Sequence, residues 1–366
     1  MSIKILILVN HEIVIYNFRK ELVDELLNKG YKVYISCPYG KKIDYFIENG
    51  CIFKDINIDR HGINPIKDLI IINEYKRLIR EIEPNFILTY TIKPNIYGSI
   101  AAKSTQVPVI ANITGLGCAV ENGGILQKIS VLMYKYAFSN INTVFFQNKE
   151  NMNFFKERKI AVTKHKLLPG SGVNLNQFQP LDYPNKETVE FVFISRIMKQ
   201  KGIDQYLDAA RFIKNKYPFT RFHICGFCEE EYENTLNNYE IQNIVKYHGL
   251  VSDIREILKD IHCTIHPTYY PEGMSNVLLE SCACARPIIT TNRSGCREIV
   301  DDTINGYVVK QQDSESLIEA IEKFLELTNE QRKQMGLSAR KKVEEEFDRN
   351  IVISRYLEVI QNESNN

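Results

Sequence analysis

Several features that mark other protein classes are missing from this sequence. No run of about 18 apolar residues occurs, so we expect no transmembrane helix. The apolar stretch 3–9 is too short for a secretory signal and instead predicts a first β-strand. The cysteine count is nine, which is odd, and the cysteines are spread without a disulfide-like framework. We therefore expect a protein of the reducing cytosol.

Two short motifs with known chemistry are also missing or incomplete. The turn that follows the first predicted strand lacks the GxGxxG fingerprint, which argues against a dinucleotide-dependent dehydrogenase. Cys225 and Cys228 have CxxC spacing, but neither a second pair of ligands nor a thioredoxin-like setting accompanies them. We therefore interpret these thiols as incidental.

The composition is that of an ordinary globular protein with an uneven charge. The 366 residues suggest two domains, with 44% apolar and 25% charged residues. Residues 1–184 contain 23 Lys and Arg against 16 Asp and Glu, a net charge of +7, and the remainder contains 23 against 29, a net charge of −6. An anionic lipid surface or a phosphorylated acceptor would suit the basic half. Random scatter of charge is the alternative.

Strand-like and helix-like segments alternate along the whole chain, which predicts an α/β protein with parallel sheets. The predicted strands are 4–9, 31–37, 51–56, 85–90, 107–113, 142–146, 190–195, 221–225, 245–248, 263–266 and 305–309. The predicted helices are 17–29, 41–49, 65–82, 125–138, 149–158, one beginning near 203, 275–284, 314–327, 330–347 and 350–361. A bend rich in Gly and Pro at 167–180 ends the first half. We place the domain boundary at Pro184.

The stretch 271–300 carries the most specific pattern. A loop with Glu272 and Gly273 follows a short apolar strand and leads into a helix whose first turn contains Ser275 and Asn276. Backbone N–H groups at a helix start are unpaired and favour an anion. Glu280 lies eight residues after Glu272, so two carboxylates flank this helix start. The arrangement suits a sugar joined to a diphosphate, whereas the alternative is a core helix with two incidental glutamates.

Two cations accompany the strand that opens the second half. Arg196 and Lys201 stand five residues apart in the loop after the predicted strand 190–195. Two such cations can clamp a diphosphate and stabilise it as it leaves. A salt-bridged loop is the alternative.

Together these motifs resemble a known family. Glu272-x7-Glu280, followed by the segments 285–289 (ARPII) and 295–298 (GCRE), resembles the donor-binding signature of family 4 glycosyltransferases, and Arg196 with Lys201-Gly202 resembles their donor-phosphate pair. The family consists of retaining, metal-independent enzymes of the GT-B fold. The resemblance covers nearly the whole chain and implies two Rossmann-like domains facing a cleft. We expect residues 1–184 to bind the acceptor, 185–348 to bind the donor, and 349–366 to return to the first domain as a helix.

The resemblance also implies roles for individual residues in the second half. Arg196 and Lys201 would bind the diphosphate, Glu280 the ribose, and Glu272 the hydroxyls of the sugar; Arg196, Lys201 and Glu272 are the expected catalytic residues. The remaining donor contacts would be Gly273, Met274, Ser275 and Asn276 near the sugar and phosphate, and Leu250 and Val251 at the nucleotide base. No metal and no cofactor besides the sugar donor are expected. A same-face route, in which the leaving phosphate helps to deprotonate the acceptor, needs no protein nucleophile.

The first half gives weaker signals for an acceptor. Lys93 and Asn95 follow the predicted strand 85–90, at the edge where open α/β sheets bind ligands, which suggests an acceptor phosphate. The alternative is that Lys93 caps a surface loop. Many family members have a His-Gly pair where this chain has Thr114-Gly115. In this respect the chain resembles the subgroup that builds capsule, O-antigen or bacterial glycan repeat units, in which the His is also missing. The helix 125–138 mixes apolar residues with lysines and could rest on lipid head groups, unless it is an ordinary core helix.

From these features we expect a hexosyltransferase that moves a hexose or N-acetylhexosamine from a UDP-sugar to an undecaprenyl-diphosphate-linked saccharide. It would act in the cytoplasm at the inner face of the plasma membrane, without a nucleic acid partner. UDP-N-acetylgalactosamine, UDP-N-acetylglucosamine and UDP-galactose all remain candidate donors. One alternative is a UDP-N-acetylglucosamine 2-epimerase, whose additional acid and base residues we cannot identify. The other is a non-catalytic nucleotide-sugar-binding partner, which only the missing His at Thr114 supports.

Overall fold

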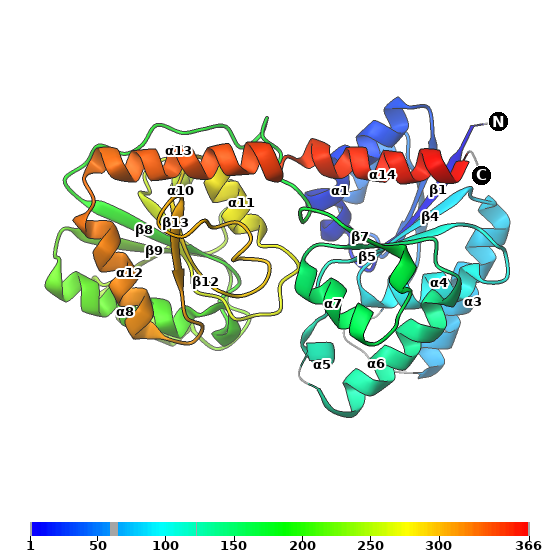
Figure 1. The fold of residues 1–366 in the computed structure, drawn as a ribbon, viewed down its shortest axis with the longest axis horizontal. Coiled ribbons are helices and arrows are strands. Elements are labelled where there is room, and N and C mark those ends of the chain that lie inside the picture. The colour runs from blue at the N-terminus through cyan, green and yellow to red at the C-terminus, as the bar shows by residue number, and fades with distance from the viewer. Residues whose placement is uncertain (1, 59–64, 122, 365–366) are drawn as a thin grey trace. The chain divides into compact units, whose positions relative to one another are not determined.

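The chain folds into two compact units, each built on its own parallel sheet (Figure 1). The computed structural model describes residues 2–58, 65–121 and 123–364. Unit 1 comprises Met1–Ser171 and Asn350–Asn366, and unit 2 comprises Gly172–Arg349. The prediction of an α/β protein with two parallel sheets is confirmed.

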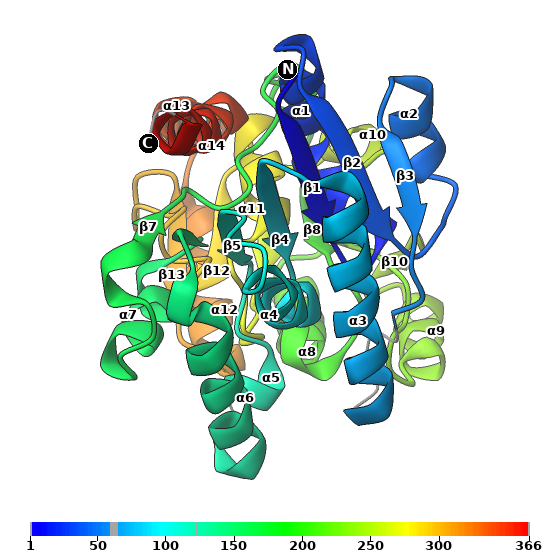
Figure 2. The same cartoon turned by 90° about the vertical axis from the view of Figure 1, so that its right-hand side faces the viewer.

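Unit 1 contains a seven-stranded sheet in the order β3-β2-β1-β4-β5-β6-β7 (Figure 2). Its strands are β1 (Lys4–Leu8), β2 (Lys32–Cys37), β3 (Ile52–Asp55), β4 (Phe86–Tyr90), β5 (Val109–Ile113), β6 (Thr143–Phe146) and β7 (His165–Leu167). The central strands are continuous apolar runs because helices cover both faces of the sheet.

Alternate side chains of these strands enter two separate cores. Leu6 and Leu8 pack with α3 (Pro65–Ile82), whereas Ile5 and Ile7 pack with α1 (Glu12–Asn28). The face that carries α3 is also covered by a π-helix (Pro94–Gly98), α4 (Ser99–Ala102), α5 (Cys118–Glu121), α6 (Gly124–Ala137), a 3₁₀ turn (Phe138–Asn140) and α7 (Lys149–Glu157). The opposite face is covered by α1, α2 (Ile43–Glu48) and α14 (Arg349–Ser364). A further 3₁₀ turn (Val162–Lys164) precedes β7.

Unit 2 repeats the same scheme with six strands in the order β10-β9-β8-β11-β12-β13. The strands are β8 (Val189–Ile194), β9 (Thr220–Cys225), β10 (Lys246–Tyr247), β11 (Cys263–His266), β12 (Ile288–Thr291) and β13 (Gly306–Val309). A 3₁₀ turn (Lys199–Lys201) follows β8, and α8 (Ile203–Lys216), α9 (Glu233–Ile241) and α12 (Ser314–Glu326) pack toward one core. The other core lies under α10 (Arg255–Leu258), α11 (Asn276–Ala283) and α13 (Asn329–Glu346).

Several details differ from the sequence-based expectations, and three of them have a local explanation. Helix α1 begins at Glu12, five residues before the predicted helix start at 17, because the Nδ1 atom of His11 accepts a hydrogen bond from the N–H of Ile13 and caps the helix. Strand β7 was not expected, because its three residues, none of them buried, give no periodic signal. Residues 172–184, expected in the first domain, belong to unit 2, where Val173 exchanges backbone hydrogen bonds with the α13–α14 junction.

The last helix, α14, is part of the core of unit 1. Tyr356 is fully buried, and its hydroxyl donates a hydrogen bond to the Oδ1 atom of Asn112 on β5. The guanidinium of Arg19 lies 5.8 Å from the centre of the Tyr356 ring and 5.1 Å from that of Tyr90. Helix α14 therefore closes one face of the unit 1 sheet through an aromatic and polar cluster. Within the described ranges, no helix combines the length and apolarity needed to cross a bilayer.

We expect Tyr356→Ala to lower the free energy of unfolding of unit 1 by about 3–5 kcal/mol, because it leaves a cavity and removes the partner of Asn112. Urea unfolding followed by circular dichroism measures this change. Arg355→Ala, at an exposed position of the same helix, should change it by less than about 0.5 kcal/mol. Equal midpoints for the two variants would contradict the view that α14 stabilises unit 1.

Candidate functional site

The loops at the carboxyl edge of the unit 2 sheet approach one another more closely than most residues allow. Gly202 has φ +81°, and a Cβ atom there would lie 2.1 Å from the carbonyl oxygen of Pro267. Gly295 has φ +88°, and its Cβ would lie 2.8 Å from the carbonyl oxygen of Gly273. Only glycine accommodates both the left-handed backbone and such contacts. The loops after β8, β11 and β12 are thereby held against each other.

Hydrogen bonds fix the loop that precedes Glu272. The Tyr269 N–H donates to the carbonyl oxygen of Gln200 at 3.0 Å, and the Thr268 hydroxyl donates to the same oxygen at 3.3 Å. From β12, the Thr291 hydroxyl donates to the carbonyl oxygen of Thr268 at 2.5 Å. The 3₁₀ turn that ends at Lys201 and the loop that ends at Glu272 are therefore one rigid assembly.

The predicted catalytic side chains come together around one aromatic ring. Lys201 forms an ion pair with Glu272, and the two side chains are only 8% and 17% exposed. The Lys201 ammonium lies 4.6 Å from the centre of the Tyr270 ring, and the Arg196 guanidinium lies 5.3 Å from it. Arg196 also pairs with Glu229 at 2.5 Å. Both cations are thus paired with carboxylates beside the same ring.

The start of α11 places backbone donors next to this cluster. The first hydrogen bond of the helix runs from the Leu279 N–H to the Ser275 carbonyl, so the N–H groups of residues 276–278 lie outside the helical ladder. The Ser275 N–H itself donates to the Gly295 carbonyl at 2.8 Å. Among the described residues, Asn276 Oδ1 is buried and has no hydrogen-bond partner. The predicted donor contacts Gly273, Met274, Ser275 and Asn276 therefore lie at a helix start where the N–H groups of residues 276–278 are outside the helical ladder.

Glu298 braces the turn that supports α11. One of its carboxylate oxygens accepts from the Gly295 N–H at 2.7 Å, and the other accepts from the Ser294 hydroxyl at 3.1 Å. In the same signature, Arg286 is fully buried and its guanidinium donates to the carbonyl oxygens of Leu258 and Asp182. These two charged residues of the signature therefore stabilise the scaffold and do not line the site.

Glu280 lies on α11 as a half-buried carboxylate. Loss of solvation raises its pKa to about 7, although the positive charge of Arg349 opposes the rise. Glu280 therefore changes its charge near neutral pH, which makes an ionised carboxylate at this position sensitive to pH.

The predicted base contacts lie in the loop after β10. Leu250 is exposed and Val251 is half-buried against the core. The loop is tied to the end of β9, because the Gly226 N–H donates to the Gly249 carbonyl at 2.7 Å. The described ranges contain no group of three or more His, Cys, Asp or Glu side chains arranged to hold a metal ion.

The predicted acceptor residues in unit 1 fall into two kinds. Lys93 lies in the turn after β4 and pairs with Asp68 at 3.3 Å, and Thr114 and Gly115 are half-exposed at the end of β5. Asn95 lies in the core instead, where its Oδ1 accepts from the Thr89 hydroxyl and its Nδ2 donates to the Asn112 carbonyl. Asn95 therefore joins β4, β5 and the π-helix, and its amide is not directed toward an acceptor.

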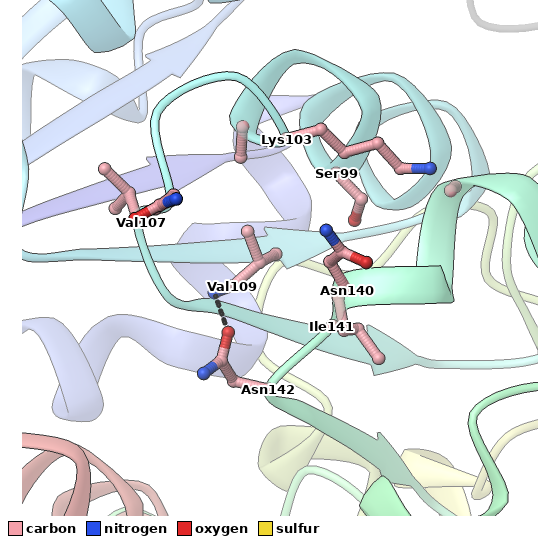
Figure 3. A pocket seen from close by; sticks show the side chains of 10 residues that line it. Ser99, Lys103, Val107, Val109, Asn140, Ile141 and Asn142 are labelled. Atoms are coloured by element: carbon pink, nitrogen blue, oxygen red, sulfur yellow. Dashed lines mark hydrogen bonds between the residues drawn. The ribbon is translucent and has the colours of Figure 1, made fainter. Parts of the chain in front are cut away.

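A hollow of about 320 Å³ lies at the opposite, amino edge of the unit 1 sheet (Figure 3). Ser99, Lys103, Asn140 and Asn142 border it. The Lys103 ammonium donates to the carbonyl oxygen of Tyr136 and to the Ser139 hydroxyl, so it holds the carboxyl end of α6. Because the predicted acceptor residues follow the carboxyl ends of β4 and β5, this hollow is separate from those residues.

Sequence reasoning missed the partners of the predicted site residues. Glu229 and Tyr270 complete the cluster around Arg196 and Lys201, but neither belongs to a spaced motif. His266 ends β11 beneath the cluster, and burial together with the charge of Lys201 lowers its pKa to about 3. His266 therefore stays neutral and adds no charge to the site.

Two family models match the chain. Residues 4–148 match the model described as glycosyl transferase 4-like, and residues 177–342 match the model described as glycosyl transferases group 1. Among curated relatives, the N,N'-diacetylbacillosaminyl-diphospho-undecaprenol alpha-1,3-N-acetylgalactosaminyltransferase of Campylobacter jejuni is 24% identical over 94% of this chain and 95% of its own length. The UDP-Gal:alpha-D-GlcNAc-diphosphoundecaprenol alpha-1,3-galactosyltransferase of Escherichia coli is 27% identical over 71% of each chain.

Solved structures agree in fold. A glycosyltransferase from Rickettsia africae superposes with a TM-score of 0.84 at 18% identity, covering 100% of this chain and 99% of its own. HepE of Anabaena, solved in complex with UDP-glucose, has a TM-score of 0.78 at 16% identity, covering 99% of this chain and 100% of its own. With one family model on each unit and this shared architecture, the chain belongs to the GT-B glycosyltransferases, with a glycosyl transferase 4-like region in unit 1 and a group 1 region in unit 2.

Proposed function

We propose that this protein is a retaining, metal-independent glycosyltransferase that moves a hexose or N-acetylhexosamine from a UDP-sugar to a saccharide on undecaprenyl diphosphate. The observation that carries this proposal is the grouping of Arg196, Lys201 and Glu272 around Tyr270, directly before the N–H groups at the start of α11 that lie outside its helical ladder. Cations, unused amides and a carboxylate within one rigid assembly match the parts of a nucleotide-diphosphate sugar.

In the proposed complex the diphosphate lies between the two cations and the start of α11. Its oxygens accept from Arg196 and Lys201, and binding separates Lys201 from Glu272. Glu272 then accepts hydrogen bonds from the sugar hydroxyls, and Glu280 accepts from the ribose. The backbone near Leu250 and Val251 contacts the base. The ion pair that is lost on binding is thus replaced by charge-assisted hydrogen bonds from Lys201 and Glu272 to the donor.

The proposed reaction breaks the bond between the anomeric carbon and the diphosphate oxygen and forms a bond from that carbon to the acceptor oxygen on the same face. The proton of the acceptor hydroxyl passes to the leaving diphosphate. Arg196 and Lys201 stabilise the negative charge that develops on this leaving group. No protein nucleophile and no cofactor are required, and the UDP-sugar is a substrate.

The nature of the donor and acceptor is supported by the relatives. The E. coli relative is named for UDP-galactose, HepE was solved with UDP-glucose, and both named relatives transfer to sugars on diphospho-undecaprenol. We propose that the acceptor binds near Lys93, Thr114 and Gly115, and we omit Asn95 because its amide is bonded in the core. The carrier lipid places the reaction at a membrane surface, so we propose that the protein is peripheral at its cytoplasmic face.

The decisive experiment measures UDP release from a panel of UDP-sugars in the presence of a chelator, with and without a lipid-diphosphate sugar acceptor. We expect release that requires both one donor and the acceptor. Arg196→Ala should reduce the rate on the order of 10²–10³-fold, because leaving-group stabilisation is lost. Arg221→Ala, an exposed arginine near the start of β9 and away from the carboxyl edge, is the matched control and should leave the rate unchanged.

Other outcomes of this experiment would contradict the proposal. Consumption of a UDP-sugar without an acceptor would favour an epimerase. UDP binding without release for any donor and acceptor pair would favour a non-catalytic partner, and rates restored only by added metal would exclude the metal-independent route.

Glu280 provides a pH-dependent prediction. If its ionised carboxylate accepts from the ribose, UDP binding should weaken as the pH falls through about 7, by up to about tenfold per pH unit. Titration calorimetry with UDP from about pH 6 to about pH 8 measures this dependence. Glu280→Gln should bind UDP more weakly at the higher pH and lose the dependence. An unchanged pH profile in Glu280→Gln would remove Glu280 from the site.

The same pKa predicts an opposite effect on folding. The folded-state pKa of Glu280 is raised above its ordinary value of 4.5, so the folded protein holds this proton more tightly than the unfolded chain. That stabilisation is complete below the ordinary value and is lost as the pH rises toward and through about 7. Glu280→Gln should therefore unfold at a higher temperature than the parent at about pH 8, and at the same temperature near pH 4.

A further inference from the structure

Helix α6 exposes an apolar stripe along its whole length. Ile125, Ile129, Leu132 and Tyr136 are spaced by four, three and four residues, which places them on one side of a helix. They are 76%, 48%, 65% and 61% exposed, although large apolar side chains of a soluble helix normally face the core. Over 14 residues the stripe is about 20 Å long.

The inner side of α6 is packed into the core of unit 1. The exposed stripe is therefore the outer side of a firmly docked helix. Tyr134 and Ala137 are buried in the unit 1 core, and the Tyr134 ring contacts Phe138 and Phe155 edge to face. Lys103 holds the last turn through the Tyr136 carbonyl. The sequence-based alternative of an ordinary core helix therefore applies to one side of α6 only.

The start of α3 presents a second exposed apolar group on the same face of the sheet. Ile66, Leu69 and Ile70 are more than half exposed and lie on one side of the first turns of α3. Both α3 and α6 contact the π-helix Pro94–Gly98. In parallel α/β units a helix starts at the carboxyl edge of the sheet, so both groups begin at the edge that carries Lys93 and Thr114.

The charges of α6 indicate what could cover the stripe. Helix α6 contains Lys128 and Lys135 and no carboxylate. Both lysines are exposed and are seven residues apart, so they lie on one flank of the stripe. Two copies of α6 packed against each other would bring only cations into the contact, without a carboxylate to pair with them. An apolar stripe flanked by lysines instead suits the surface of an anionic bilayer.

We infer that the exposed side of α6, extended by the start of α3, docks on an anionic lipid bilayer with the stripe among the acyl chains and the lysines at the head groups. This inference depends on the proposed function in one respect only: a lipid-linked acceptor gives the protein a reason to dock on a membrane. It would bring the carboxyl edge of the unit 1 sheet, with Lys93 and Thr114, to the layer in which the carrier diphosphate lies.

The test is co-sedimentation of the full chain with vesicles of phosphatidylcholine, with and without phosphatidylglycerol. We expect binding that requires phosphatidylglycerol and weakens with salt. Ile129→Glu combined with Leu132→Glu should weaken binding at least tenfold. Lys128→Gln and Lys135→Gln should each weaken it about fivefold. Ile241→Glu, which changes an 83% exposed isoleucine at the end of α9, is the matched control and should bind as the parent does.

Two further measurements separate this inference from its rivals. UDP release with a short-chain, water-soluble acceptor should be unchanged in the Ile129 and Leu132 variant, so loss of docking is distinguished from loss of catalysis or folding. Light scattering reports the oligomeric state. Vesicle binding that survives the Glu substitutions would overturn the inference, and so would a dimer of the parent that these substitutions dissociate.

Discussion

The ion pair between Lys201 and Glu272 is the interaction on which the site of unit 2 depends. Burying one charge alone is costly, and removing one partner of a buried pair leaves the other uncompensated. Here both side chains are more than four-fifths buried beside an aromatic ring. In the proposed complex, a ligand that separates this pair binds best if it supplies both an anion for Lys201 and hydrogen-bond donors for Glu272. A diphosphate sugar supplies both within one molecule, whereas a free nucleotide supplies only the anion, so the pair favours the complete donor.

This pair exists because backbone segments from three different loops approach closely. Gly202 and Gly295 remove the Cβ atoms that would separate these loops, and the shared acceptor Gln200 and the hydroxyl of Thr291 lock them together. The glycine beside Lys201 is thus as necessary for the position of the ammonium as the lysine itself. Glu298 also acts by positioning the backbone, because its carboxylate accepts from the Gly295 N–H and braces the turn beneath α11.

Much of the architecture could be predicted from the sequence, because long apolar strands and periodic helices carry strong local signals. The exceptions are short or half-exposed elements such as β7, and a helix start that depends on the single side chain of His11. For the site, the motif residues were predictable through the family signature. Their partners Glu229 and Tyr270 were not, because contacts between loops distant in sequence leave no spacing pattern. Asn95 shows the reverse error: a polar residue near a sheet edge was expected to face a ligand, but its amide satisfies the core.

The two units are built in the same way, but the carboxyl edges of their sheets carry different side chains. In each, helices return the chain from the carboxyl to the amino edge of a parallel sheet, so the carboxyl edge collects the loops. Unit 2 fills that edge with paired charges and with the backbone amides at the start of α11. Unit 1 places there one paired lysine and a half-exposed Thr-Gly turn, and it leaves apolar side chains of α3 and α6 uncovered beyond them. Polar loops suit a ligand drawn from water, and apolar helix starts suit one carried in lipid. This contrast between two carboxyl edges, rather than any single residue, is the strongest support for the proposal that unit 2 binds the donor and unit 1 the lipid-borne acceptor.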